Sequence, residues 1–247
     1  MRGSCLGAVA AALTLHLAAA QSPAFNVDSV HARTHLLAFT ATEGTWTSAD
    51  VSPDGRMVAF DLLGTLYEMP MAGGDARPLT RGRSYNQFPR YSPDGTRILF
   101  TSDRSGKEEL WVLYRGTDSL EKVSNFDYRA FQGSWSRDSR SIYLSAMDLG
   151  ARYSGHRIDR YGSRTDLVKN GVFAPPTHFT EHPANGKVYY SEPAGPIFQS
   201  GFRIRSYDLK TGELATYIER PGGAADPSIS PDGRWMSYIH RDRKSVV

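Results

Sequence analysis

The stretch Phe88-Pro89-Arg90-Tyr91-Ser92-Pro93-Asp94-Gly95-Thr96-Arg97-Ile98-Leu99-Phe100-Thr101 decides the fold of this chain. Ser92, Pro93 and Gly95 stand at positions that type I β-turns favour. The residues after the turn are mainly apolar or β-branched, as in a strand. The stretch therefore predicts two strands joined by a tight hairpin at residues 92–95.

The four-residue turn recurs along the chain at a nearly constant spacing. Its last residues are Gly55, Gly95, Ser139, Gly186 and Gly233, so successive copies are 40 to 47 residues apart. The five tetrads are Ser52-Pro53-Asp54-Gly55, Ser92-Pro93-Asp94-Gly95, Ser136-Arg137-Asp138-Ser139, Pro183-Ala184-Asn185-Gly186 and Ser230-Pro231-Asp232-Gly233. This period is that of one four-stranded propeller blade. The sequence predicts an all-β propeller with about five visible repeats, the last one truncated.

Short apolar and β-branched runs between the tetrads predict the remaining strands. The predicted strands are 45–51, 58–60 and 65–69 in the first repeat, 88–91, 97–101, 109–114 and 120–123 in the second, 177–182, 187–190, 202–209 and 214–218 in the fourth, and 226–230 and 235–240 in the fifth. The fourth repeat also contains an inserted loop at 192–201. The third repeat has lost Pro and Gly from its tetrad and carries a Gly- and Arg-rich run at 150–164, so its strands are poorly defined by sequence.

The first 20 residues have the features of a bacterial secretory signal peptide. Arg2 precedes an apolar stretch at 6–17, and Ala18-Ala19-Ala20 resembles a cleavage site. The stretch is shorter than the roughly 18 residues that a membrane span needs, so we expect no span after cleavage. We therefore expect a periplasmic or secreted protein with a signal peptide at 1–20, a leader at 21–40 and a β-propeller with an incomplete fifth blade at 41–247.

Charge and cysteine content exclude several classes of protein. The net charge is +3, and removing Arg2 with the signal peptide leaves +2, too small an excess to indicate a nucleic-acid partner. The single cysteine, Cys5, lies in the signal peptide, so the mature chain has no disulfide framework and no cysteine nucleophile. The 227 residues after cleavage suffice for about five blades.

The fifth repeat predicts an incomplete ring. Its pattern stops at Val247, two strands short of a blade, and a propeller closes its ring to remove exposed strand edges. We expect the chain to be part of a longer protein. The alternative is that residues 24–40, which contain one plausible strand at 36–40, return to complete the last blade.

The blade pattern resembles the WD40-like repeat of TolB-type propellers. The resemblance rests on the Ser-Pro-Asp-Gly tetrads, on Ser102-Asp103-Arg104-Ser105-Gly106 and on Leu110-Trp111-Val112. A narrower resemblance joins residues 39–46, 50–55, 60–64 and 72–74 to the N-terminal propeller of exported bacterial amidohydrolases. It implies a metal-dependent hydrolase domain beyond Val247, with a divalent metal only in that missing domain. That family's His-x-His metal pair is absent here, so we expect no cofactor in this chain.

One histidine pair fits a zinc motif but has an unsuitable context. His178-Phe179-Thr180-Glu181-His182 matches His-x-x-Glu-His, a pattern that requires a helix. Prolines flank it, and the repeat places it on an inner strand. There His178 and His182 would share a face about 13 Å apart, too far for one zinc ion. We interpret the segment as a strand that lines the central channel.

Other motifs favour structural roles. His31 and His35 lack a third ligand, Ser119 and Lys122 have Ser-x-x-Lys spacing without companion motifs, and Gly-x-Ser-x-Gly is absent. The tetrad residues Asp54, Asp94, Asp138 and Asp232 are expected to accept backbone hydrogen bonds in their turns, and Asp103 and Arg104 to form a local pair. Trp46, Trp111, Trp135 and Trp235 are expected to lie in the core between blades. No catalytic, cofactor-binding or metal-binding residue is predicted.

These observations favour a non-catalytic propeller module of an exported amidohydrolase-like protein, shaping substrate access or binding a partner. Its partner would be another protein or a fused hydrolase domain. Two alternatives remain open, namely a stand-alone periplasmic interaction propeller like TolB and the propeller of a prolyl-oligopeptidase-type serine peptidase.

Overall fold

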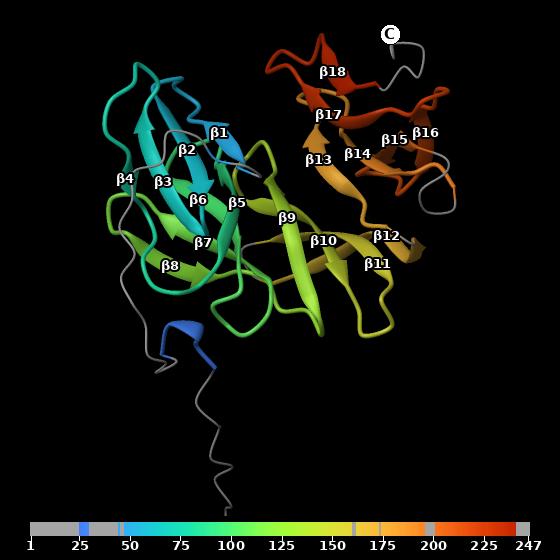
Figure 1. Ribbon diagram of the computed structural model, residues 1–247. Helices are drawn as coiled ribbons and strands as arrows, with labels where there is room; N and C mark the ends of the chain where they lie inside the picture. Colours follow the sequence, from blue (N-terminus) through green and yellow to red (C-terminus); the bar gives the residue numbers. More distant parts are fainter. Residues whose placement is uncertain are drawn as a thin grey trace, which may run out of the picture.

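Radially arranged antiparallel sheets make up the computed structural model (Figure 1), which describes residues 25–29, 44, 47–159, 162–172, 174–195 and 201–240. Four sheets have four strands each and a fifth has two. The all-β propeller prediction with about five repeats is therefore confirmed. The predicted signal peptide and the strand expected at 36–40 lie outside the described residues.

Each sheet is one blade, and its strands follow one another in sequence from the inner to the outer edge. Blade 1 contains β1 (Ala49–Val51), β2 (Met57–Leu62), β3 (Thr65–Pro70) and β4 (Arg77–Pro78); blade 2 contains β5 (Asn86–Tyr91), β6 (Arg97–Ser102), β7 (Glu109–Tyr114) and β8 (Ser119–Lys122). Blade 3 contains β9 (Arg129–Trp135), β10 (Ser141–Met147), β11 (Tyr153–Asp159) and β12 (Arg164–Val172); blade 4 contains β13 (Thr177–Glu181), β14 (Lys187–Pro193), β15 (Phe202–Asp208) and β16 (Leu214–Ile218). Blade 5 contains β17 (Ala225–Ile229) and β18 (Met236–Ile239).

Most predicted strands agree with these bounds to within two residues, two differ, and one strand lies where the sequence defined none. Of the strand expected at 45–51, β1 comprises Ala49–Val51 and excludes residues 47–48, while 45 and 46 lie outside the described residues. β14 continues to Pro193, into the region predicted to be an inserted loop. The Gly- and Arg-rich run at 150–164 holds all of β11, Tyr153–Asp159, which pairs with β10 over its full length.

The tetrads form turns held by the same hydrogen bonds in successive blades. In blade 2, Ser92 Oγ donates to Asp94 Oδ1 (2.6 Å), which accepts from the backbone N–H of Thr96 (2.9 Å). The corresponding Ser to Asp bonds in blades 1, 3 and 5 are also 2.6 Å long. The predicted structural role of the tetrad aspartates is therefore confirmed.

Blade 4 builds its turn one residue out of register with the predicted tetrad. The backbone N–H of His182 bonds to Lys187 O, as that of Ser92 bonds to Arg97 O. His182 thus takes the place of the tetrad serine, and its Nδ1 accepts from the backbone N–H groups of Ala184 and Asn185. Glycine at 186 then supplies the left-handed conformation, with φ +67°.

Buried apolar side chains lie between consecutive blades. A blade with a neighbour on each side has both faces of its sheet covered. Leu99 and Leu110 of blade 2 pack against Ile142 and Leu144 of blade 3. Separate clusters join blade 1 to blade 2, blade 3 to blade 4, and blade 4 to blade 5. Burial of this surface is the dominant force holding the arc of blades together.

The tryptophans do not all have the predicted core position. Trp111 and Trp135 are half-buried against the clusters between blades. Trp235, in contrast, is 71% exposed, so its predicted core role is wrong. It lies next to the two-stranded sheet β17–β18, where no described strand covers it. Trp46 lies outside the described residues.

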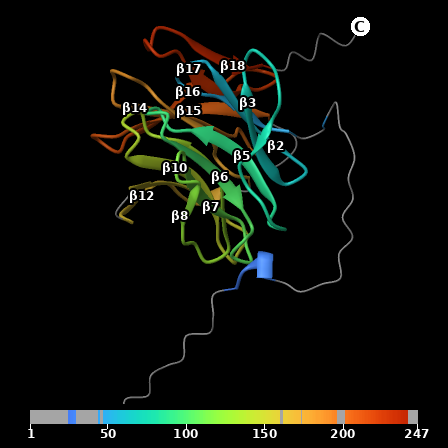
Figure 2. The same cartoon turned by 90° about the vertical axis from the view of Figure 1, so that its left-hand side faces the viewer.

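The short 3-10 helix η1, Val27–Ser29, lies beside the blades (Figure 2) and does not extend a sheet. Its contacts are with the turns of blades 1 and 2, since Val27 N–H donates to Arg104 O (3.0 Å). The described part of the leader therefore does not join the last blade. Within the described residues, no helix is long and apolar enough to cross a membrane.

Candidate functional site

The inner strands share a conformational feature that faces the centre of the arc. Phe88, Gln132, His178 and Asp226 each precede the first residue of their turn by four positions, and each has a positive φ of 51 to 57°. Such values are uncommon for residues other than glycine. Strained backbone positions of this kind gather at functional sites. We refer to Phe88, Gln132, His178 and Asp226 as the inner ring.

β-bulges accompany the inner ring. The pairing of the inner strand with its neighbour shifts register between Gln87 and Arg90, between Thr177 and Thr180, and between Ala225 and Ser228. A bulge re-aims side chains that would otherwise alternate across the strand. The bulges in β5, β13 and β17 therefore turn Phe88, His178 and Asp226 towards the channel.

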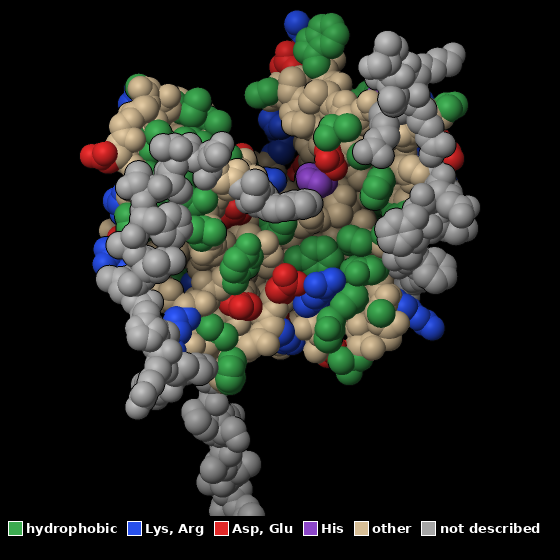
Figure 3. All heavy atoms as spheres, viewed as in Figure 1, with side chains coloured by type: hydrophobic (Ala, Val, Ile, Leu, Met, Phe, Trp, Pro, Cys, Tyr) green, Lys and Arg blue, Asp and Glu red, His purple; other side chains and the backbone are tan. Residues whose placement is uncertain are grey.

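These strands enclose a cavity of about 390 Å³. It is lined by residues of β1, β5, β9, β13 and β17: Ala49, Asp50, Phe88, Arg90, Gln132, Gly133, Ser134, His178, Phe179, Thr180, Asp226, Pro227 and Ser228. Figure 3 shows acidic, basic and histidine side chains around a hollow between the sheets. Polar groups therefore converge in this channel from five blades.

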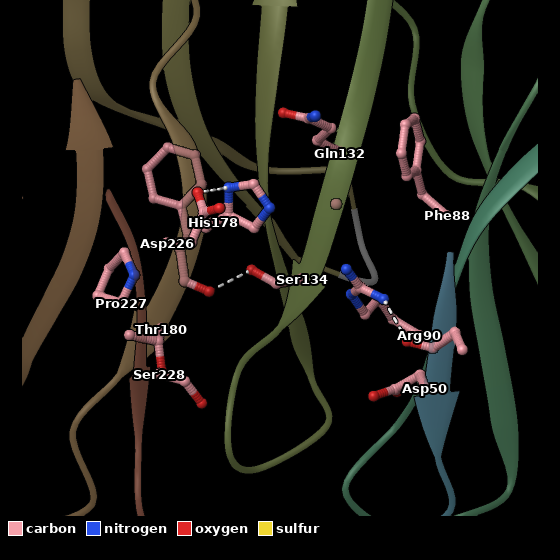
Figure 4. A pocket seen from close by; sticks show the side chains of 13 residues that line it. Asp50, Phe88, Arg90, Gln132, Ser134, His178, Thr180, Asp226, Pro227 and Ser228 are labelled. Carbon is pink, nitrogen blue, oxygen red and sulfur yellow. Dashed lines mark hydrogen bonds and ion pairs between the residues drawn. The ribbon is translucent and has the colours of Figure 1, made fainter. Parts of the chain in front are cut away.

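An imidazole and a carboxylate meet on one wall of the channel. His178 Nδ1 lies 2.7 Å from Asp226 Oδ1 (Figure 4), and both side chains are partly exposed to the channel. The adjacent His178 imidazole lowers the pKa of Asp226 below its ordinary value, although partial burial of the carboxylate acts in the opposite direction. The carboxylate is therefore ionised at neutral pH.

Asp50 and Arg90 lie on another part of the channel wall (Figure 4). Burial raises the pKa of Asp50, although the backbone N–H of Tyr91 donates to its Oδ2 (2.8 Å) and Arg90 lies close. Arg90 Nη1 donates to Pro89 O (3.0 Å) and Ala49 O (3.3 Å). The channel consequently has two charged regions, each containing an acidic and a basic group.

Gln132, which lines the channel, carries an unpaired acceptor. The amide oxygen of Gln132 is buried and has no hydrogen-bond partner within the described part of the chain. The nearby hydroxyl of Ser134 donates to Phe179 O (2.7 Å), which ties β9 to β13. An unpaired buried acceptor costs free energy, so the Gln132 amide is suited to receive a donor from a ligand or water.

The predicted inner strand at the histidine pair is confirmed, but its predicted geometry is wrong. His178 and His182 were expected to share one strand face, whereas the bulge at His178 breaks the alternation. His178 pairs with Asp226 in the channel, while His182 Nε2 lies 3.1 Å from Gly233 O of the next turn. The two histidines thus contact different partners.

Several other sequence candidates lie away from the channel. Ser119 and Lys122 are both exposed on the outer strand β8. Asp103 Oδ1 accepts from the backbone N–H of Tyr85, and Arg104 donates to Ser102 and Asn86, so each stabilises the turn through other residues. His31 and His35 lie outside the described residues. Among the described residues, no group of three or more His, Cys, Asp or Glu side chains is suited to hold a metal ion.

The structure brings together a Ser-His-Asp set that the sequence analysis missed. Ser154 Oγ lies 2.7 Å from His156 Nε2, and His156 Nδ1 lies 2.9 Å from Asp166 Oδ1. The same atoms meet in serine hydrolases. Ser154 and His156 are only 8% and 6% exposed, however, and Phe126 packs on the imidazole. Burial lowers the pKa of His156. We interpret the set as a buried hydrogen-bond network in blade 3.

The feature of the sequence that could have predicted this set is the spacing of its residues along β11 and β12. Ser154 and His156 are two positions apart and so share a strand face, while Asp166 pairs directly with His156 across the ladder. Because strands in this repeat were poorly defined by sequence, their register was not predictable.

Two curated relatives match about three quarters of this chain. The Bacillus subtilis protein named uncharacterized peptidase YuxL is 26% identical over 203 residues, covering 78% of this chain and 29% of its own length. The Agrobacterium fabrum protein Atu1656 is 33% identical over 195 residues, covering 76% of this chain and 52% of its own. The chain thus spans about half or less of the length of these relatives.

Solved structures have the same fold. A putative TolB from Agrobacterium tumefaciens has a TM-score of 0.68 at 17% identity, covering 81% of this chain and 71% of its own. TolB from Acinetobacter baumannii has a TM-score of 0.58 at 20% identity, and the match covers 73% of this chain and 45% of the TolB chain. The narrower resemblance to amidohydrolases is not shown by these comparisons. The family PD40, described as TolB beta propeller domain, matches residues 16–192, and the chain therefore belongs to this family of TolB-type β-propellers.

Proposed function

We propose that this chain is a non-catalytic binding module of an exported protein, and that its channel receives an extended polar segment of a protein partner or a fused domain. The observation that carries the proposal is the inner ring. Four successive inner strands accept a strained conformation and thereby aim Phe88, Gln132, His178 and Asp226 into one cavity. Strained backbone positions tend to gather at functional sites, which supports this role.

The chemistry of the ring supports a peptide-like ligand. Phe88 offers an apolar surface, the Gln132 oxygen accepts a hydrogen bond, and the Asp226 carboxylate attracts a cation. A peptide presents all three complementary features, namely apolar side chains, N–H donors and basic groups. The cavity volume lies within the range of sites for small ligands.

Binding is tested with blocked tetrapeptides that contain lysine, glutamate or glutamine at one position, using isothermal titration calorimetry. The lysine peptide should bind more tightly than the glutamate peptide, and Asp226→Asn should weaken its affinity at least about fivefold. Asp127→Asn, at an exposed position outside the channel, is the matched control and should leave affinity unchanged. Equal affinity of all three peptides for the wild type and both variants would contradict the proposal.

The absence of catalysis is tested on the same chain. With zinc and amide or cyclic-amide substrates it should show no turnover. A fluorophosphonate probe, which reacts with activated serines, should leave Ser154 unlabelled because the residue is buried. Labelling that disappears in Ser154→Ala but not in Ser145→Ala, or reproducible hydrolysis, would show that the chain is an enzyme.

For the whole protein we propose a hydrolase in which this propeller controls access to a separate active site. The amidohydrolase alternative rests on the sequence resemblance at 39–74, whereas the relative named as a peptidase favours a serine peptidase. The coding sequence downstream of Val247 distinguishes them. A His-x-His pair after a strand supports the first, a Gly-x-Ser-x-Gly motif the second, and a stop codon the stand-alone periplasmic propeller.

A further inference from the structure

The segment Phe25–Ser29 presents one carboxylate to the blades. Asn26 Oδ1 accepts from the backbone N–H of Asp28 (2.9 Å), and Asn26 O accepts from Ser29 N–H (3.1 Å) and Ser29 Oγ (2.7 Å). This local turn uses the polar groups of the segment itself. The Asp28 side chain is left to point at the loop between β4 and β5.

That loop forms a receptor for a carboxylate. Asp28 Oδ1 accepts from the backbone N–H groups of Arg83 (2.6 Å) and Ser84 (3.0 Å), and Ser84 Oγ lies 3.2 Å from both carboxylate oxygens. Successive N–H groups that follow a left-handed residue form an anion-binding nest, and Gly82 has φ +105°. Ser84 is only 5% exposed, so its hydroxyl is a built part of the site.

Glycine at 82 also keeps the site open. A Cβ atom at this position would lie 2.3 Å from Asp28 Oδ1. A side chain here would therefore occupy the space of the carboxylate, in addition to straining the backbone.

Arg104 supplies positive charge behind the nest. Its guanidinium lies 4.9 Å from the Trp111 ring centroid and donates to Ser102 Oγ (3.1 Å) and Asn86 Oδ1 (3.0 Å). Burial opposes ionisation of Asp28, but the N–H groups of Arg83 and Ser84 together with the Arg104 charge bring the pKa of Asp28 below its ordinary value. The loop at 82–84 and Arg104 thus favour the ionised carboxylate of Asp28 over its protonated form.

Little else holds the segment in place. None of Val27, Asp28 and Ser29 is buried, and Phe25 is 59% exposed. Beyond the carboxylate, its contacts with the blades among the described residues are one backbone hydrogen bond from Val27 to Arg104 and the packing of Phe25 beside Gly106. A segment with so few buried contacts opens at low free-energy cost.

We propose that residues 82–84 and Arg104 form a carboxylate-binding site that Asp28 occupies in the same chain, and that this site receives an acidic side chain of a partner peptide when the Asp28 segment opens. The chemistry that recognises the partner is an aspartate presented by a short turn, as in Phe25–Ser29. The site is separate from the channel of the proposed function, so either proposal can fail alone.

The first experiment adds a peptide to the full chain with Asp28→Ala. The probe is acetyl-Phe-Asn-Val-Asp-Ser-amide, and the readout is the NMR shifts of the Arg83 and Ser84 amides. We expect saturable shifts, at least about tenfold weaker binding to the wild type, in which Asp28 competes, and at least about tenfold weaker binding of the same peptide with asparagine in place of aspartate. Equal binding of the two peptides, or no binding to Asp28→Ala, would overturn the proposal.

Two further arms define the site. Acetate at the same concentrations should give no saturable shift, because the segment's turn contributes to recognition; binding as tight as that of the peptide would refute a peptide ligand. Adding Gly82→Ala to Asp28→Ala should abolish peptide binding. The matched control is Gly73→Ala, whose φ is also positive (+89°) but whose Cβ would meet no atom within 4 Å. Loss of binding in both glycine variants would indicate general unfolding and contradict the specific role of Gly82.

Discussion

Asp226 and His178 show how a single contact links the channel to stability. Their 2.7 Å contact joins blade 4 to blade 5, because His178 lies on β13 and Asp226 on β17. The backbone N–H of Asp226 also donates to Ser191 Oγ of β14 (2.7 Å). A ligand that pairs with this carboxylate therefore acts on the junction of two blades.

Asp226→Asn should destabilise the protein in a pH-dependent way. The folded-state pKa of Asp226 is lowered from 3.8, so its ionised form contributes stability above pH 3.8, and this contribution is lost as the pH falls through the folded-state pKa. In urea unfolding, the midpoint of the variant should be lower than that of the wild type at about pH 7, and the difference should shrink as the pH falls below 3.8 through the folded-state pKa. A difference independent of pH would show that the carboxylate charge is irrelevant.

At the scale of elements, the tetrad turn has the same bonds in different surroundings. Ser92 is fully buried, whereas the hydrogen bond of Ser230 is exposed to solvent. Both hydroxyls donate to the turn aspartate at 2.6 Å and accept a backbone N–H at 3.0 Å. The comparison separates the effect of burial from that of the bond itself.

Ser92→Ala should cost about 1–3 kcal/mol of unfolding free energy, because it leaves buried polar groups without a partner. Ser230→Ala should cost about 0.5 kcal/mol or less, since water replaces the lost bond. Chemical denaturation of both variants measures the difference. Equal losses would mean that burial of the turn does not control its contribution.

The inner ring makes a prediction about backbone conformation. Gln132 has φ +51°, which glycine adopts readily and a β-branched residue does not. Gln132→Val should therefore be less stable than Gln132→Gly by at least about 1 kcal/mol, although valine favours ordinary strands. Thermal unfolding of the two variants checks the order. A more stable valine variant would show that β9 relaxes to a regular strand and that the ring geometry is not required.

At the scale of the whole molecule, contacts between blades hold the arc together. The guanidinium of Arg97, in blade 2, lies over the ring of Trp135, in blade 3, 4.7 Å from the ring centroid. The indole Nε1 of Trp135 also donates a hydrogen bond to Arg90 O (3.1 Å). Trp235, which follows the turn of blade 5 and directly precedes β18, is in contrast 71% exposed. The two tryptophans thus report on a covered and an uncovered blade face.

Trp135→Ala should lower the unfolding free energy by about 2–4 kcal/mol, through loss of packing and of the stacked arginine. The unfolding free energy of Trp235→Ala should stay within about 0.5 kcal/mol of that of the wild type. Acrylamide should quench the fluorescence of Trp235 more strongly than that of Trp135. A large loss for Trp235→Ala would mean that another surface covers this residue in solution, for example in an oligomer.

The amino-acid sequence determined the blade count, the turns and most strand bounds. These features depend on local chemistry: proline, aspartate and glycine fix each turn, and apolar runs on either side form the strands. The same local pattern placed residues 177–182 on an inner strand that lines the channel, and the strand spans Thr177–Glu181.

Only the tertiary structure decided what the functional residues contact. Bulges at Phe88, His178 and Asp226 changed the faces that simple alternation predicted, and neighbouring blades about 45 residues apart in sequence brought His178 to Asp226. The register of β11 and β12 assembled Ser154, His156 and Asp166, and the fold brought Asp28 to a loop 55 residues away. Such contacts depend on long-range packing, which local sequence preferences do not encode.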